Sequence, residues 1–266
     1  MKSAKVVESS INDFKGILTP SEVIESKRKS RNEFDKMSNR ISSKEMNGAL
    51  YDMYKKSYEQ KTLLDDATSK VYNQQMDSTV RSAGKEDGNW KFPIKYEDEF
   101  GKKASGMLEV KKTGNKKEYF FTDEKNETVK LKKGEFDNKL KDNIRNDIEE
   151  KYGMDSLYTI TADDGSKLSF VDSRTDRDPN KEYNDGKTGI NVYYTDASGH
   201  KEQLTKTEVN QKVVDNGISR ESAQRGRADS LARDDGHAAK DAMKAAHGLY
   251  KELESSMGLM NTANGR

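Results

Sequence analysis

The chain has 266 residues, of which 31% are hydrophobic and 36% are charged. An ordinary globular domain has more apolar and fewer charged residues, so this composition argues against one thick core and favours several thin cores with long solvated helices. Lys and Arg (48) nearly cancel Asp and Glu (47), which argues against a global basic field that attracts nucleic acid. The chain has no cysteine, and this excludes disulfides, thiolate catalysis and cysteine-ligated metal sites.

The N-terminal residues lack the uninterrupted apolar stretch of a Sec signal peptide. No apolar run approaches the roughly 20 residues that a membrane-spanning helix needs. We therefore expect no membrane span and a cytoplasmic or virion-associated protein.

Residues 1–84 are expected to form an N-terminal helical arm. Thr19-Pro20-Ser21-Glu22 predicts a helix start, because it combines a capping box with proline at the first helical position. A second helical segment, residues 44–83, has apolar residues mostly three, four or seven positions apart, with Ser57 and Gln60 interrupting the seam. Helices of this length without caps usually belong to a coiled coil or bundle, so this arm needs a partner helix.

Residues 88–153 have the pattern of a small β-rich module. Apolar and polar residues alternate from Trp90 to Tyr96, as in a half-buried strand, and Pro93 favours a sheet edge because proline donates no backbone hydrogen bond. Later apolar residues recur every four positions, which predicts a helix that Gly153 ends in the left-handed conformation. Three further strands are expected between these elements, around residues 108–110, 119–121 and 128–131.

Residues 154–217 repeat this order of elements. Asp164-Gly165 predicts a hairpin turn, and Thr205-Lys206-Thr207-Glu208 predicts the capping box of a closing helix. Residues 119–140 and 192–213 align without a gap at a spacing of 73 residues (192 − 119). Because strand, turn and helix cap match in register, we interpret the two halves as a tandem duplication of one ββββα module.

Residues 218–266 are expected to form a C-terminal helical arm and a tail. Apolar residues from Leu231 to Met257 follow three-, four- and seven-residue spacing, and several are alanines that allow another helix to approach closely. The predicted fold class is therefore α+β. Two tandem ββββα modules lie between long N- and C-terminal helices, for which an antiparallel coiled coil is one arrangement.

Asp98, Glu109 and Lys111 are candidate catalytic residues. Their order resembles the metal-binding pattern of restriction-type nucleases, in which two carboxylates hold Mg²⁺ and a lysine stabilises the attacked phosphate. So short a pattern arises often by accident in a chain with 36% charged residues. The second module also has Ser169 or Phe170 near the position of Glu109, so a metal-dependent nuclease stays an alternative.

No cofactor or metal site is predicted. Acidic residues alternate within residues 172–187 as in a calcium loop, but Pro179 intrudes and Lys187 stands where glutamate is needed, so we expect a solvated interstrand loop. The histidines have no spacing typical of metal ligands and are expected at the surface. They are His200, His237 and His247.

Aromatic residues of the predicted strands are the candidate binding residues. They are Trp90, Phe120, Phe121, Tyr193 and Tyr194. Small sheets bury most such side chains in their cores, but neighbouring strand residues point to opposite faces. One member of each neighbouring pair must therefore face away from the core unless a helix covers both faces, which predicts a docking position.

The preferred functional hypothesis is a non-enzymatic structural or protein-interaction component. Lysine-rich composition, duplication and the absence of cysteine favour a bacterial or bacteriophage assembly protein, a virion component or a host-directed effector. The expected partner is a protein or a second copy of the chain. A nucleic-acid-binding module is a further alternative that uses the aromatic residues and the basic run from Lys27 to Arg31. Acidic residues surround that run, so we interpret it as the solvated face of a helix.

Overall fold

The computed structural model describes residues 7–8, 12–39, 49–84, 86–97, 102–162, 164–176, 178, 182, 184–205 and 208–209. The chain divides into two compact units, one with residues 1–4, 41–53 and 205–266 and the other with residues 5–40 and 54–204. The second unit contains nearly all of the described structure. None of the described helices is both long and apolar enough to cross a bilayer.

The first helix, α1 (Pro20–Ser38), begins with the predicted capping box. The Glu22 amide donates to Thr19 Oγ1 at 3.4 Å, and the Thr19 amide donates to Glu22 Oε2 at 2.7 Å. Lys70 Nζ also donates to Glu22 Oε2, at 2.6 Å. These hydrogen bonds, first that of Lys70 and then those of Thr19, lower the pKa of Glu22 to about 2. The helix start was thus correctly predicted from four residues.

Helix α2 (Ala49–Met76) continues into one π-helical turn, η1 (Asp77–Arg81). Within the second unit, α1 runs antiparallel to it: Glu22 contacts Lys70 near the start of α1, and Phe34 contacts Tyr58 edge-on near its end. Within its described residues, the predicted helical segment 44–83 is an α-helix that ends in a wider π-helical turn. Ser57 and Gln60, which interrupt its apolar seam, are both buried. Gln60 Oε1 accepts a hydrogen bond from the Asn12 amide at 3.0 Å, which compensates for the burial of this polar group.

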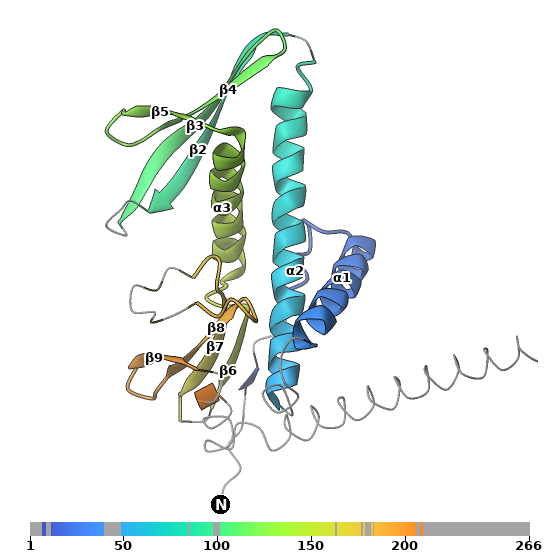
Figure 1. The fold of residues 1–266 in the computed structure, drawn as a ribbon, viewed down its shortest axis with the longest axis vertical. Coiled ribbons are helices and arrows are strands. Elements are labelled where there is room, and N and C mark those ends of the chain that lie inside the picture. The colour runs from blue at the N-terminus through green and yellow to red at the C-terminus, as the bar shows by residue number, and fades with distance from the viewer. Residues whose placement is uncertain are drawn as a thin grey trace, which may run out of the picture. The chain divides into compact units, whose positions relative to one another are not determined.

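The first sheet has four antiparallel strands in the order β2 (Gly88–Glu97), β3 (Lys103–Thr113), β4 (Lys116–Thr122) and β5 (Thr128–Leu131). Helix α3 (Lys133–Tyr152) follows and ends at Gly153, whose φ of 60° is the predicted left-handed conformation. We call these five elements module 1, shown in Figure 1. Its core also takes side chains from α2 and from Phe14 and Leu18.

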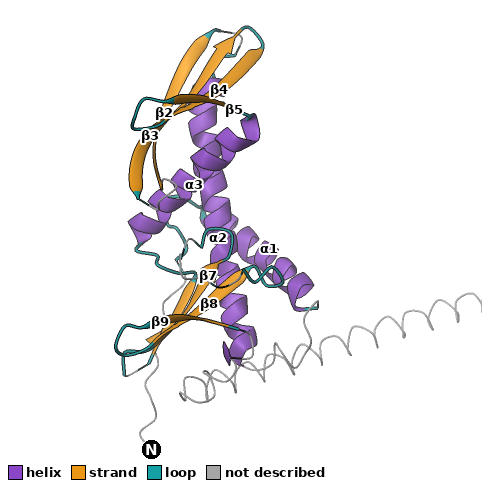
Figure 2. Cartoon of the chain, turned by 60° about the vertical axis from the view of Figure 1, so that its left-hand side comes forward, coloured by secondary structure: helices purple, strands orange, loops and turns teal. Residues whose placement is uncertain are grey.

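The second sheet has five strands in the order β1-β6-β7-β8-β9. The first, β1 (Val7–Glu8), pairs with the edge of β6 (Tyr158–Thr161). The others are β7 (Lys167–Asp172), β8 (Ile190–Thr195) and β9 (Lys201–Leu204). We call β6–β9 module 2; Figure 2 shows the two sheets as separate groups of strands. The chain is thus mixed α+β, with two antiparallel sheets and the helices α1, α2 and α3 in its described part.

The two sheets share one pairing register. Phe120 pairs with Lys130 in module 1, and Tyr193 pairs with Gln203 in module 2, 73 positions later in both strands (193 − 120, 203 − 130). On the other side of the same strands, Glu109 pairs with Phe120 and Ser169 pairs with Tyr193. The residue of module 2 that corresponds to Glu109 is therefore Ser169 and not Phe170.

The turns and caps correspond as well. Asp123 Oδ1 accepts from the amides of Lys125 and Glu127, and Asp196 Oδ1 accepts from the amides of Ser198 and His200. The capping glutamates also match, because the amide of Lys132 donates to Glu135 at 2.8 Å and that of Thr205 donates to Glu208 at 2.7 Å.

The two sheets differ in what pairs with the backbone of their first edge strand. Pro93 lies in the edge strand β2, as predicted, and its neighbour Lys95 donates its amide to Asn143 Oδ1 of α3 at 2.7 Å. This amide therefore has no need of a further strand. The corresponding edge of module 2 is filled, because Val7 pairs with Thr161.

Helix α2 contacts both sheets inside the second unit. Tyr72 of α2 donates to Asp137 of α3 at 2.6 Å, whereas Tyr54 packs edge-on against Phe170 of β7 with ring centroids 5.5 Å apart. Tyr58 donates to the carbonyl of Thr188, and burial raises the pKa of Tyr58 to about 12. The C-terminal arm, residues 218–266, and its coiled coil lie outside the described residues.

Candidate docking face

The sheet of module 1 has one face packed against α3 and one face turned away from it. Phe92, Leu108 and Phe121 lie on the packed face and belong to the core cluster with Phe136 and Leu140 of α3. The alternate residues therefore point to the opposite side, which we call the outer face. The residues on it are Asn89, Lys91, Pro93 and Glu97 of β2; Lys103, Ser105, Met107, Glu109, Lys111 and Thr113 of β3; Lys116, Glu118, Phe120 and Thr122 of β4; and Thr128 and Lys130 of β5. The side chain of Lys95 instead reaches Glu150 of α3 at 3.4 Å.

Phe120 lies in the middle of this outer face. Its row across the sheet is set by the register, in which Lys91 pairs with Glu109, Glu109 with Phe120, and Phe120 with Lys130. Lys111 Nζ lies 5.0 Å from the centre of the Phe120 ring, within cation–π range. The aromatic ring is half-buried and is bordered by lysine side chains.

Lysines outnumber glutamates on the outer face. Glu118 accepts from Lys130 at 2.6 Å and contacts Lys116 at 3.2 Å, and these hydrogen bonds lower the pKa of Glu118. The lysine side chains stay largely exposed, at 61% for Lys130 and 75% for Lys116. Exposed ion pairs of this kind are weak, so the lysines remain available to a stronger anionic partner.

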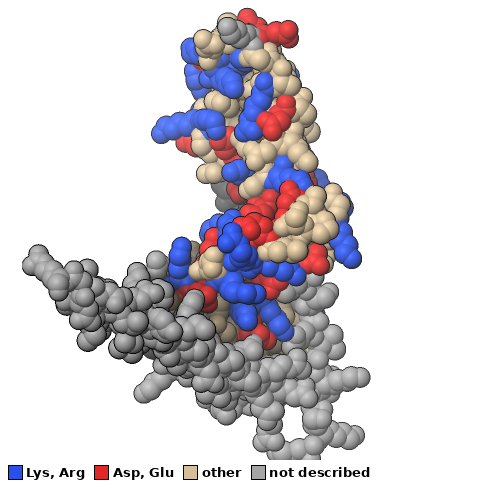
Figure 3. Space-filling view, turned by 90° about the vertical axis from the view of Figure 1, so that its right-hand side faces the viewer, with Lys and Arg blue, Asp and Glu red and all other residues tan. Residues whose placement is uncertain are grey.

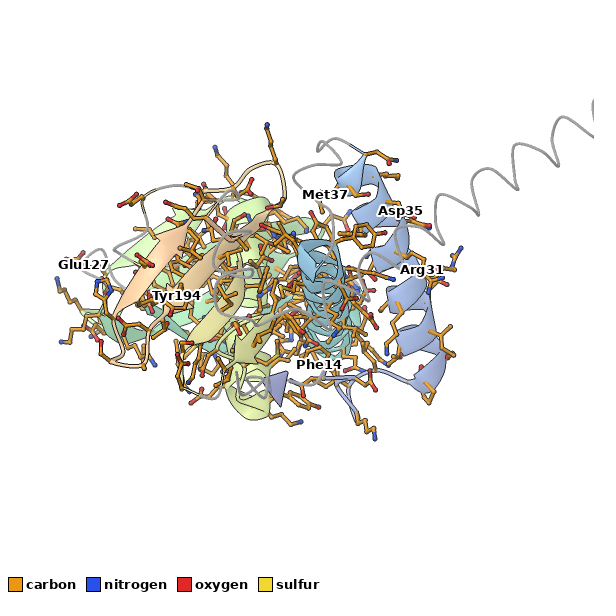
Figure 4. All side chains as sticks on the ribbon, turned by 90° about the horizontal axis from the view of Figure 1, so that it is seen from below. Phe14, Arg31, Asp35, Met37, Glu127 and Tyr194 are labelled. Atoms are coloured by element: carbon orange, nitrogen blue, oxygen red, sulfur yellow. The ribbon has the colours of Figure 1, made fainter. Side chains whose placement is uncertain are left out.

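The predicted aromatic residues have different surroundings. Trp90 and Phe121 pack into the core of module 1, and Tyr193 is 2% exposed. Tyr194 is half-buried on the opposite face of β8 from Tyr193, and Figure 4 labels it. Phe120 is therefore the predicted binding residue that lies on the open side of a sheet.

The loop between β7 and β8 covers the outer face of module 2. Asp176 Oδ2 accepts from Tyr193 Oη at 2.6 Å and from Asn191 Nδ2 at 2.5 Å. Asp178 pairs with Lys201 at 2.5 Å, and Lys201 Nζ lies 4.2 Å from the Tyr193 ring centre. The predicted solvated loop is thus wrong at Asp176, because hydrogen bonds from the sheet compensate the burial of its carboxylate.

A second loop carboxylate is also buried. Asp185 is 9% exposed, and its Oδ1 accepts from the amides of Lys187 and Thr188 at 3.0 and 3.2 Å. Alternating acidic residues therefore serve loop folding here. Among the described residues there is no group of three or more His, Cys, Asp and Glu side chains arranged to hold a metal ion.

Sequence reasoning missed a buried ion network that joins α2, α3 and β7. Arg145 of α3 is 5% exposed and contacts Asp65 at 2.7 Å and Asp172 at 3.3 Å. Arg174 contacts the same two carboxylates at 2.9 and 2.7 Å. Lys61 lies 4.0 Å from Asp172. Sequence spacing gives no signal for it, because its members are far apart along the chain.

The network determines the charge state of its members. Burial by itself would raise the pKa of Asp172, but hydrogen bonds from Arg174 and the charge of Lys61 lower it below its ordinary value. Burial lowers the pKa of Lys61, and Asp172 acts against this effect. A pocket of about 390 Å³ lies beside the network, and Asp172 and Asp176 in its wall are already held by hydrogen bonds.

The candidate nuclease residues are brought together only in part. Glu109 Oε2 lies 3.7 Å from Lys111 Nζ, and Glu109 Oε1 accepts from Asn89 at 2.5 Å. Asp98 lies outside the described residues. His200 is exposed in the β8–β9 turn, and His237 and His247 lie outside the described residues.

The basic run of α1 is partly used by neighbouring acidic groups. Lys27 contacts Asp13 at 3.3 Å and Glu59 at 3.2 Å, and Lys29 contacts Asp66 at 2.9 Å. Arg31 is exposed and points away from α2 (Figure 4). Basic and acidic side chains intermingle on the α1 and α2 side of the described residues (Figure 3), so the run forms no continuous basic stripe there.

Comparisons with protein-family models, with curated proteins and with solved structures found no match for this chain.

Proposed function

We propose that the chain is a non-enzymatic structural or protein-interaction component that carries two copies of one ββββα module. The main support for this proposal is that the outer faces of the two sheets have different surroundings. In module 2 the chain covers that face with its own loop, whereas among the described residues no such loop lies over Phe120 and the lysines of module 1. A duplicated frame that keeps its register while its surfaces diverge is typical of proteins that present binding surfaces.

The proposal that the modules are copies rests on their hydrogen bonds as well as their sequences. Strand register, turn carboxylates and capping glutamates coincide residue by residue at one offset. Unrelated four-stranded sheets have no physical reason to share all three features. Of the helix predicted to follow β9, only Glu208 and Val209 are described, and both are helical.

The C-terminal arm is proposed as the self-association element. Leu249 and Leu253 lie on its predicted apolar seam, four positions apart. Such a seam is stabilised only when another helix covers it. An assembly role in a bacterium, a bacteriophage particle or a host cell would use this arm to join copies and the modules to meet a partner.

The test is the mass of the full chain in solution, measured by size-exclusion chromatography with light scattering. We expect a stable oligomer, and the Leu249→Glu/Leu253→Glu variant should shift it to the monomer. Lys251→Glu/Lys244→Glu is the matched control, because it changes charge on the same predicted helix away from the seam, and it should keep the oligomer. A wild-type chain that is strictly monomeric and retains no protein in pull-downs would refute the proposal.

A further inference from the structure

Module 2 shows within this chain how the outer face of such a sheet can be occupied. The occupant is the β7–β8 loop, whose described carboxylates meet the sheet: Asp176 binds the Tyr193 hydroxyl, and Asp178 binds Lys201. The backbone takes part too, because the amide of Glu182 donates to the Gln203 side chain at 2.7 Å. Tyr193, Gln203 and Lys201 all belong to the outer face, by their alternation along β8 and β9.

The equivalent positions of module 1 are Phe120, Lys130 and Thr128, each 73 residues earlier. An aromatic ring with a lysine over it recurs in both modules, since Lys201 lies over Tyr193 and Lys111 lies over Phe120. Module 1 thus keeps an aromatic ring with a lysine over it, whereas Phe120 lacks the hydroxyl that binds Asp176 and Thr128 stands in place of Lys201.

In the described part of module 1, the connection that corresponds to this loop is too short to cover the outer face. Only Gly114 and Asn115 join β3 to β4, whereas residues 173–189 join β7 to β8. The φ of Gly114 is 59°, as a tight turn requires. The outer face of module 1 therefore keeps its lysines exposed where module 2 has internal carboxylates.

We infer that the outer face of β2–β5, centred on Phe120, binds an extended acidic segment of a partner protein. This inference rests on the proposed function, for which it names the surface and the chemistry of the partner. The acidic residues of the segment pair with Lys91, Lys111 and Lys130, and its chain lies across the Phe120 ring. Lysine excess on the face supplies the charge complementarity, and the loop of module 2 supplies the precedent for a peptide occupant.

The face suits a peptide better than a nucleic acid. Glu109 lies directly beside Phe120 in the register and Glu118 is the next acidic residue on the same face of β4. A continuous phosphate backbone would meet these carboxylates, whereas a peptide can place its acidic side chains individually on the lysines. Single-stranded nucleic acid is therefore a competing outcome that the test must distinguish.

The experiment measures fluorescence anisotropy of a labelled decapeptide of alternating glutamate and threonine, titrated with the full chain at low ionic strength. A decapeptide with lysine in place of glutamate and an oligothymidylate of equal length are the comparison probes. We expect the glutamate peptide to bind most tightly. Tighter binding of the oligothymidylate would overturn the inference in favour of a nucleic-acid surface.

Charge-reversal variants locate the binding. Lys111→Glu/Lys130→Glu should weaken binding of the glutamate peptide about tenfold, because two exposed charge pairs become repulsive. Lys117→Glu/Lys125→Glu has the same net charge but lies off the outer face, and should change binding less than about twofold. Equal weakening by both variants would show a net-charge effect and overturn the inference.

Two further measurements guard against misfolding. Acetylation of lysines in the wild-type chain should be slowed by the peptide at Lys111 and Lys130 and unchanged at Lys117. Phe120→Tyr, which copies module 2, should keep binding. If the peptide fails to bind while light scattering shows an oligomer, the inference is refuted and the proposed function stands. If the peptide binds this face in a strictly monomeric chain, the self-association proposal is refuted and the inference stands.

Discussion

Arg145 shows how one side chain joins elements that sequence patterns treat separately. Its guanidinium reaches Asp65 on α2, Glu149 one turn along α3, and Asp172 at the end of β7. A planar group with five N–H donors can satisfy several carboxylates at once, which an ammonium cannot do with the same geometry. The network therefore couples module 2 to the two helices.

Removing Arg145 should destabilise the fold strongly. Arg145→Leu leaves Asp172, which is 1% exposed, with fewer partners, and we expect the free energy of unfolding to fall by about 3 kcal/mol. Urea denaturation measures this change. The control is Lys95→Ala, which breaks the exposed pair with Glu150 and should cost less than about 1 kcal/mol. Similar losses in both variants would contradict the structural role given to the network.

Asp172 should also make stability depend on acid. Its pKa is lower in the folded chain than the ordinary value of 3.8, so the unfolded chain takes up the proton first as the pH falls. Its contribution is present at neutral pH and is lost as the pH falls through the folded pKa. Asp172→Asn should therefore flatten the acid side of a plot of unfolding free energy against pH. Parallel curves for the wild type and the variant would count against this assignment.

At the scale of the element, α3 offers two glycines with opposite requirements. Gly153 has a φ of 60°, whereas Gly134 lies in the first turn of the helix without a positive φ, and added Cβ atoms at either would meet no neighbour within 4 Å. Gly153→Ala should cost about 1 kcal/mol through backbone strain alone. Gly134→Ala should stabilise the fold by up to about 1 kcal/mol, because alanine has the higher helix propensity. Thermal unfolding of the two variants should shift in opposite directions, and equal shifts would show that the φ difference is unimportant.

Local elements were the easier part to predict from the sequence. The strand β5 has the predicted bounds, and the cap of α1 and the end of α3 at Gly153 are as expected. These features depend on alternation, on side chains within one helical turn, or on one glycine. Residues that are close together in the sequence therefore determine these features.

Long-range arrangements were the harder part. The partner of α2 could not be identified, because the spacing of apolar residues specifies a buried stripe and not the surface that covers it. The buried loop carboxylate of Asp176 was also missed, since a polar loop pattern carries no sign of the hydrogen bonds from Tyr193 and Asn191. For the candidate site, the sequence indicated the aromatic pairs, and the structure was needed to separate Phe120 from Tyr193.

At the scale of the whole molecule, the sharing of α2 between the sheets of the second unit should determine cooperativity. Its residues Leu63 and Leu64 lie in the core cluster of module 1, whereas Tyr58 donates to Thr188 beside module 2. Neither sheet can leave this helix without exposing apolar surface. We therefore expect both modules to unfold in one transition.

Trp90 makes this prediction measurable, because it is the single tryptophan of the chain and packs against the core of module 1. Its fluorescence in urea reports on module 1. A fluorophore on Ser198→Cys, in the exposed β8–β9 turn, reports on module 2, and the chain has no other cysteine. Coincident midpoints are expected, and midpoints that differ would mean that the sheets fold independently on the shared helix.

The connection between β7 and β8 has a consequence for how many ligands one chain can hold. Its residues 173–189 stand where the other sheet has only Gly114 and Asn115, while the pairing of the strands on both sides is unchanged. Insertions at this hairpin are therefore tolerated by the frame. On the proposed binding of a partner segment to the outer face, a version with two short hairpins would bind two segments and one with two long hairpins would bind none, so hairpin length alone would set the number of binding sites.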